Sequence, residues 1–159
     1  MSTVNGLPAH VLLVHIVVVL VPLTALALIA AALWPRAARR LGVLLPVLAF
    51  VALVSVPLTT QAGEWLERHV GDDALVRRHT ELGDGLLPWA LGLFLLATLV
   101  WWATRRPDGG RLSALPVRIA VGALSVAVAA GAVVDVYRIG DSGAKAAWHD
   151  AYDKTAQGN

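Results

Sequence analysis

Four long apolar stretches, separated by short polar segments, dominate the pattern of hydrophobic and polar positions along the chain. They cover residues 11–34, 41–61, 86–104 and 115–137, each close to the ~20 residues that an α-helix needs to cross a bilayer. Within them, the side chains of Asp, Glu, Lys, Arg and His are confined to His15, Arg118 and Asp135. A charge at the centre of a bilayer costs at least ~2.5–3.5 kcal/mol, so this distribution predicts four transmembrane helices.

Composition supports an all-α fold, an integral membrane four-helix bundle in which residues 1–159 form a single transmembrane domain. Hydrophobic residues make up 57% of the chain and charged residues 15%, whereas a soluble domain has about a quarter of its residues charged. The four helices would be apolar on every face, and a chain of 159 residues has too little polar helix to cover them in water. We therefore expect the lipid bilayer to be the first partner of the protein.

Basic residues are concentrated in two of the three links between the apolar stretches. They are Arg36, Arg39 and Arg40 in the first link and Arg105, Arg106 and Arg111 in the third. By the positive-inside rule these links are cytoplasmic, which places both termini and the second link on the extracytoplasmic side. The abundance of Arg, Ala, Val and Leu is typical of a GC-rich bacterial genome, so we expect a multi-pass protein of the bacterial cytoplasmic (inner) membrane.

The second link, residues 62–85, is predicted to form a helical hairpin on the extracytoplasmic side. The helix of the second stretch continues past the membrane to about His69, Gly71 breaks it, and Asp72 or Asp73 caps a new helix. The tail, residues 141–159, contains a segment that can form a further short helix over residues 144–152.

All five histidines are expected on the extracytoplasmic side. They are His10, His15, His69, His79 and His149. His69 is expected to be a solvated loop residue, and the other four are candidate ligands of a metal ion. A single haem, the other candidate cofactor, would be held by His15 and His79. His10 and His15 lie ~140° apart on a helix, which is not the i, i+4 geometry of a two-histidine metal site. The absence of Cys excludes thiolate ligands and covalent haem attachment.

A stripe of small residues runs through the fourth stretch and ends at an acidic residue. Its members, which recur every four residues, are Ala123, Ala127, Gly131 and Asp135. Small residues at this spacing are typical of closely packed transmembrane helices, so Asp135 is expected to face the bundle. Its candidate partners are His15, in a hydrogen bond that locks two helices together, and Arg138, with which it would form a structural polar pair.

These features favour binding over catalysis. The chain contains no H-E-x-x-H motif, no phosphate-binding glycine loop and no nucleophile elbow, so an enzyme is weakly supported. The net charge of +2, without a basic stripe interleaved with aromatics, excludes nucleic acid as a partner. The first hypothesis is a binding or accessory membrane module whose outward His/Asp cluster binds a cofactor, a metal ion, another membrane protein or a second copy of the chain. The alternative is a membrane redox protein with a single haem or metal on the extracytoplasmic side.

Four segments carry a resemblance to a known family. Residues 6–15, GLPAHVLLVH, resemble the N-terminal signature of the bacterial membrane family catalogued as domain of unknown function 2231, in which a second histidine follows the first after five residues. Residues 62–67, 79–83 and 138–145 resemble further features of that family. The chain differs from the signature at Val11, where members often have Pro. The resemblance implies a four-helix membrane protein and implies no established activity.

Overall fold

The protein is almost entirely helical in a computed structural model that describes residues 3–4, 7–69, 73–105 and 114–156, with side chains from residue 9 to residue 148. The helices are α1 (Ala9–Leu33), α2 (Pro35–Leu41), α3 (Leu44–Glu67), α4 (Ala74–Asp84), α5 (Leu86–Arg105) and α6 (Leu115–Ala156). Two short antiparallel strands, β1 (Thr3–Val4) and β2 (Leu7–Pro8), precede them.

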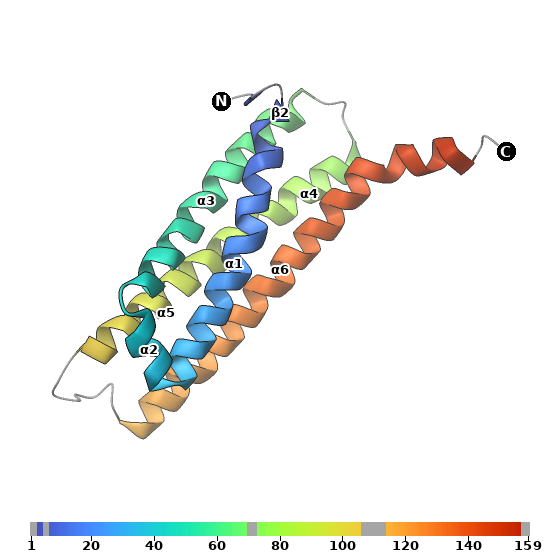
Figure 1. Cartoon of the computed structure of the whole chain (residues 1–159). Coiled ribbons are helices and arrows are strands. Elements are labelled where there is room, and N and C mark those ends of the chain that lie inside the picture. The colour runs from blue at the N-terminus through green and yellow to red at the C-terminus, as the bar shows by residue number, and fades with distance from the viewer. Residues whose placement is uncertain (1–2, 5–6, 70–72, 106–113, 157–159) are drawn as a thin grey trace.

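Four segments within the described residues are long and apolar enough to cross a membrane, as the four apolar stretches predicted. They are Ala9–Leu33, Leu44–Glu67, Ala74–Arg105, in which α4 leads into α5, and Leu115–Trp148. Figure 1 shows them side by side as a bundle, with the order α1, α3, α5, α6 around it. Successive helices run in opposite directions, so the N-terminus of α1, the end of α3 and the whole of α4 lie at one end of the bundle.

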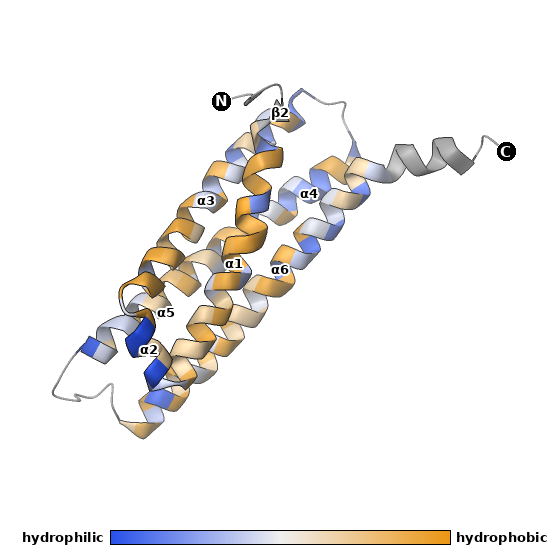
Figure 2. Ribbon diagram, viewed as in Figure 1, coloured by the Kyte–Doolittle hydropathy of each residue, from blue (hydrophilic) through white to orange (hydrophobic). Residues whose placement is uncertain are grey.

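Alanine is the most common residue of the buried interior, where it packs with Val and Leu, and large apolar side chains also cover the outside of the bundle. Ala25, Ala49, Ala97 and Ala132 are each at most 1% exposed, whereas large residues such as Leu26, at 65%, are exposed. Figure 2 shows the apolar character along the bundle, with hydrophilic residues gathered towards its ends. Small interior residues let helix backbones approach closely, and large exposed apolar side chains suit contact with lipid. The chain is therefore a multi-pass membrane protein.

Two elements differ from the expected ones. The first link, expected as a connection only, forms the short helix α2, because Pro35 stands in its first turn and Ala38, only 3% exposed, packs into the core. Helix α6 does not end near Tyr137 but continues without a break into the tail as far as Ala156.

The cap of α4 agrees with one of the two predicted residues. Asp73 is the N-cap of α4, because its side chain accepts a hydrogen bond from the Leu75 backbone N–H over 2.8 Å. Asp72 and Gly71 lie outside the described residues.

The consecutive helices α4 and α5 pack along α6 in one continuous antiparallel register. The facing pairs are Gly92 with Val128, Trp89 with Gly131, Gly85 with Asp135 and His79 with Ser142. A side chain at Gly131 would overlap the six-membered ring of Trp89, so the bare glycine backbone allows this contact. Gly85 separates α4 from α5 with helical backbone angles, so the two helices follow α6 together.

The buried face of α6 is rotated from the expected small-residue stripe. Ala123 and Ala127 are exposed, and Gly131 and Asp135 are only partly buried. The buried positions in the span are instead Gly122, Ser125, Ala129, Ala132 and Val136. Residues four apart advance by ~40° around a helix at each step, whereas alternating steps of three and four stay on one face. The expectation that the whole stripe faces the bundle was therefore wrong for its first two members.

Candidate functional site

His10 and His79 come together at one end of the bundle, which we call the histidine end. Their ring centroids are 6.0 Å apart, and the ring planes meet at 81°, an edge-to-face arrangement. His10 lies in the first turn of α1 and His79 in the middle of α4, and both side chains are partly buried. Two imidazoles that are far apart in the sequence thus lie next to each other where the spans give way to more polar segments.

His10 is held by the last turns of α3. Its Nδ1 lies 3.0 Å from the carbonyl oxygen of Thr59. Gly63, one turn further along α3, makes room for the ring, because a Cβ atom there would lie 3.0 Å from Nδ1 and 3.1 Å from Cε1. The contact therefore fixes the ring of His10 against the backbone of α3, where Gly63 has no side chain to cover it.

His79 is held in the same way by α6. Its Nδ1 lies 3.1 Å from the carbonyl oxygen of Ile139 and 3.0 Å from Oγ of Ser142. The Ser142 hydroxyl donates its own hydrogen to the Ile139 carbonyl over 2.8 Å and is therefore an acceptor for His79. A Cβ atom at Gly143 would lie 2.9 Å from Cε1 of His79, so a glycine again makes room for the ring.

The two histidines thus share one local arrangement. Each ring bonds to a carbonyl of a neighbouring helix, and the residue four positions after that carbonyl is a glycine: Gly63 after Thr59 and Gly143 after Ile139. In a helix this carbonyl already accepts the N–H of that glycine, and the missing side chain leaves it open to the histidine as a further donor, in addition to the Ser142 hydroxyl at Ile139. Sequence reasoning overlooked this role of the two glycines, although a glycine inside an otherwise good helical segment was the available signal.

The hydrogen bonds determine which nitrogen of each neutral ring carries the proton. A carbonyl oxygen only accepts, so Nδ1 must donate in both histidines, which leaves Nε2 with a free lone pair. Neither Nε2 has a hydrogen-bond partner among the residues that the structure describes. A ring whose Nδ1–H is fixed by a carbonyl and whose Nε2 is free has the form that imidazole takes as a metal ligand.

The other histidines lie apart from this pair. His15 is exposed on α1, and its Nδ1 lies 2.6 Å from the carbonyl oxygen of Val11 in the same helix. His69 is also exposed, with Nδ1 2.7 Å from the carbonyl oxygen of Trp65, on whose ring it stacks. The side chain of His149 lies outside the described residues. The structure therefore places His10, rather than His15, beside His79.

Asp135 lies deeper in the bundle, below the histidine pair. Its Oδ2 is buried with no hydrogen-bond partner among the described residues, and it points towards the junction of α4 and α5, where a Cβ atom at Gly85 would be 3.7 Å away. No ion pair joins Asp135 to Arg138 within the described part of the chain. The polar pair of Asp135 and Arg138 stays a prediction from the sequence.

The pair of imidazoles is the full set of nitrogen ligands that the structure brings together here. Among the described residues, no group of three or more His, Asp or Glu side chains could hold a metal ion. An ion at the pair would therefore need water or groups from another molecule to complete its coordination.

Comparisons with known proteins identify the family of the chain. Neither the curated proteins nor the solved structures include a match to it. The sequence model of one family covers residues 6–156, which is nearly the whole chain and includes His10, His79 and both of their glycines. The chain therefore belongs to the family described as "Predicted membrane protein (DUF2231)".

Proposed function

We propose that the protein is a non-enzymatic membrane module that binds a transition-metal ion at the histidine end, through Nε2 of His10 and His79. Water or a partner protein supplies the remaining ligands, so the site is an open one. In this proposal the histidine end faces the extracytoplasmic side. Arginines at the opposite end support that orientation: Arg36, Arg39, Arg40, Arg105 and Arg118.

The observation that carries the proposal is the pair of fixed Nδ1–H groups. Each ring is oriented by a carbonyl from another helix, so binding an ion would cost little rotational freedom of the side chains. Two imidazoles bound to one ion through bonds of ~2.0–2.1 Å have their ring centres roughly 5–6 Å apart. The observed separation of 6.0 Å between the ring centroids lies within this range.

A single haem is the alternative ligand of the same pair. Haem would also use Nε2 of two imidazoles from facing helices, here α1 and α4. A porphyrin needs an enclosed apolar slot, whereas the groove beside this site, between α4 and α6, is open and has four charged side chains next to Leu75, Leu82 and Tyr137. We therefore favour the metal ion over haem.

Metal analysis and titration of the purified protein test the proposal. The chain in detergent should contain or take up Zn²⁺ or Cu²⁺, and the single variants His10→Gln and His79→Gln should each lose this uptake. His69→Gln is the matched control, because His69 is an exposed histidine whose Nδ1 bonds only its own helix. Binding should also be lost in acid, since protons compete with the ion for Nε2.

The outcomes separate the candidate functions. Equal uptake by wild type, His10→Gln and His79→Gln would contradict a site at this pair. A Soret band that disappears in both variants would replace the metal ion by haem. Absence of both a bound metal and a Soret band would leave the histidines as cross-links between helices, in which case the variants should lower stability alone.

A further inference from the structure

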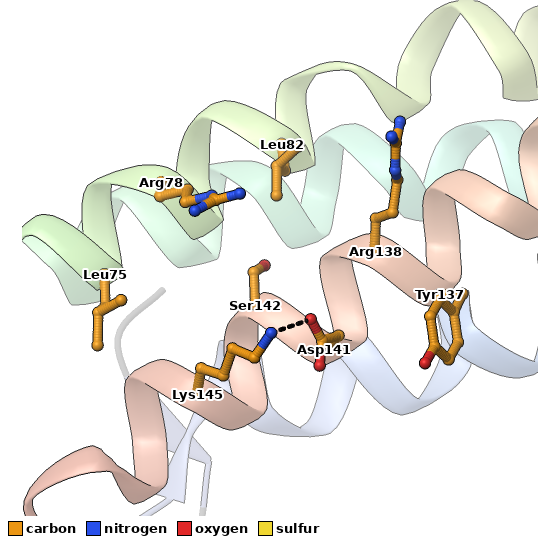
Figure 3. Close-up of a pocket in the computed structure, with 8 residues that line it drawn as sticks. All are labelled: Leu75, Arg78, Leu82, Tyr137, Arg138, Asp141, Ser142 and Lys145. Carbon is orange, nitrogen blue, oxygen red and sulfur yellow. Dashed lines mark hydrogen bonds and ion pairs between the residues drawn. The ribbon is translucent and has the colours of Figure 1, made fainter.

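A groove of about 380 Å³ lies between α4 and α6 at the histidine end, beside the histidine pair (Figure 3). Three cationic side chains line it, Arg78 from α4 and Arg138 and Lys145 from α6. Its one carboxylate, Asp141, is paired with Lys145 at 2.7 Å, so it neutralises only that cation. The groove therefore has an excess of positive charge, which belongs to the two arginines.

Arg78 and Arg138 form no ion pair within the part of the chain that the structure describes, although the negative charge of Asp135 attracts Arg138. No ion pair or hydrogen bond of either guanidinium is found within the described residues. Figure 3 shows them on opposite helices, with Arg78 extending along α4, Arg138 reaching from α6 towards α4, and Leu82 between them in this view. A guanidinium presents a planar set of donors that matches the oxygens of a phosphate, and two of them can clamp one such group.

The position of the groove relative to the bilayer indicates that its phosphate comes from a lipid headgroup. The apolar outer surface of α6 ends at Val134, 54% exposed, and Tyr137, 74% exposed, and Arg138 follows directly. Exposed Tyr next to an apolar span is typical of the interface between hydrocarbon and headgroups. The groove extends from Tyr137 to Lys145, ~12 Å along the helix, and so covers the headgroup layer, which is ~5–8 Å thick on each side of the bilayer.

The walls of the groove suit a lipid better than a free anion. Leu75, Leu82 and Tyr137 line it together with the charged groups, so apolar surface lies next to the cations. A phospholipid headgroup joins an anionic phosphodiester to apolar chains, and it would contact both kinds of side chain at once. Inorganic phosphate would contact the arginines alone.

We propose that this groove binds the phosphodiester of an anionic phospholipid, clamped between Arg78 and Arg138 with its glycerol and chains along Leu75, Leu82 and Tyr137. The site is distinct from the metal site, although Ser142 contributes to both by lining the groove and bonding to His79. Because the metal would bind His10 and His79 and the phosphodiester would bind Arg78 and Arg138, either proposal can fail without the other.

Native mass spectrometry of the full chain in detergent tests this site. We expect phosphatidylglycerol to bind more tightly than phosphatidylcholine, whose choline cation would meet the arginines. The double variant Arg78→Gln/Arg138→Gln should bind phosphatidylglycerol about 25-fold more weakly, since each cation near the membrane surface contributes roughly a fivefold effect. Arg68→Gln is the control, because Arg68 is an exposed arginine at the same end outside the groove.

A second variant guards against an indirect effect on folding. Arg78→Lys/Arg138→Lys keeps both charges and should retain most of the binding, which a misfolded protein would not do. Unchanged binding of phosphatidylglycerol in the Gln double variant would overturn the proposal. Displacement of the lipid by millimolar inorganic phosphate would also overturn it, and would assign the groove to a free anion instead.

Discussion

The interior of the spanning bundle and the histidine end use polar groups in opposite ways. Inside the spans, the hydroxyls of Ser55, Thr59 and Thr98 bond to carbonyls three or four residues earlier in their own helices. The hydroxyls of Thr24 and Ser125 are buried and have no bonding partner in the described part of the chain. At the histidine end, His10 and His79 bond to carbonyls of other helices.

This difference shows that two kinds of interaction determine how the helices are arranged. In the spans, helices are held by a packed core of Ala, Val and Leu in which the small residues allow close contacts, and the bonded hydroxyls of Ser55, Thr59 and Thr98 do not join one helix to another. At the histidine end, His10 links α1 to α3, His79 links α4 to α6, and the ring contact links the two pairs. Packing therefore aligns the helices along the membrane, and the two imidazoles fix where four of them meet.

The largest effect is expected from filling a close contact in the spans. Gly131→Ala should lower the free energy of unfolding by roughly 1–3 kcal/mol, because the new methyl group would overlap the ring of Trp89 and force it to move. Unfolding of the detergent-solubilised protein by a denaturing detergent, followed by circular dichroism, measures this change.

A double variant shows whether the contact itself is responsible. Trp89→Leu/Gly131→Ala removes the ring that the methyl group would meet, so its stability should equal that of Trp89→Leu alone within a few tenths of a kcal/mol. If Gly131→Ala is as stable as wild type, packing against Trp89 does not hold α5 to α6. That result would contradict the claim that close packing holds the helices together in the spans.

The sequence predicts the first region far better than the second. Four apolar stretches of about 20 residues, with at most two Asp, Glu, Lys, Arg or His side chains in any one of them, have essentially one solution in lipid, so the four spans follow from the cost of burying charge. The rotation of each helix does not follow, because the spans are apolar on all sides. That is why Ala123 and Ala127 were expected inside, and why His15 was preferred over His10 as the neighbour of His79.

The histidine end depends on distances that a single sequence does not contain. His10 and Thr59 are 49 positions apart, and His79 and Ile139 are 60 apart. The local signals were present as Gly63 and Gly143, but a glycine in a helix has several explanations, and only the packed helices show that a ring lies over each of them. The groove between α4 and α6 escaped notice for the same reason.

A smaller effect is expected when one histidine is displaced from its glycine. Gly143→Ala puts a methyl group 2.9 Å from Cε1 of His79, and the ring can move away at the expense of its bond to Ile139. We expect a loss of about 1 kcal/mol in the free energy of unfolding and weaker metal uptake. Gly140→Ala is the matched control on the same helix, because a Cβ atom there meets nothing within 4 Å.

The control should change stability in the opposite direction. Replacing Gly by Ala in a helix without a steric conflict stabilises it by up to ~1 kcal/mol, so Gly140→Ala should be as stable as wild type or more so. If both alanine variants behave alike and retain metal uptake, the glycine beneath His79 is not needed to position the ring.

The smallest effect is expected from replacing a buried hydroxyl in the spans that forms no hydrogen bond with any described residue. The Thr24 hydroxyl is fully buried in α1, and no residue that the structure describes bonds to it, so Thr24→Val, which keeps the shape of the side chain, should raise the free energy of unfolding by ~0.5–1 kcal/mol. The same measurement on His10→Gln should show a loss instead, since there the lost group bonds across helices. A loss of stability in Thr24→Val would mean that the hydroxyl has a bonding partner, and that the spans too depend on polar contacts between helices.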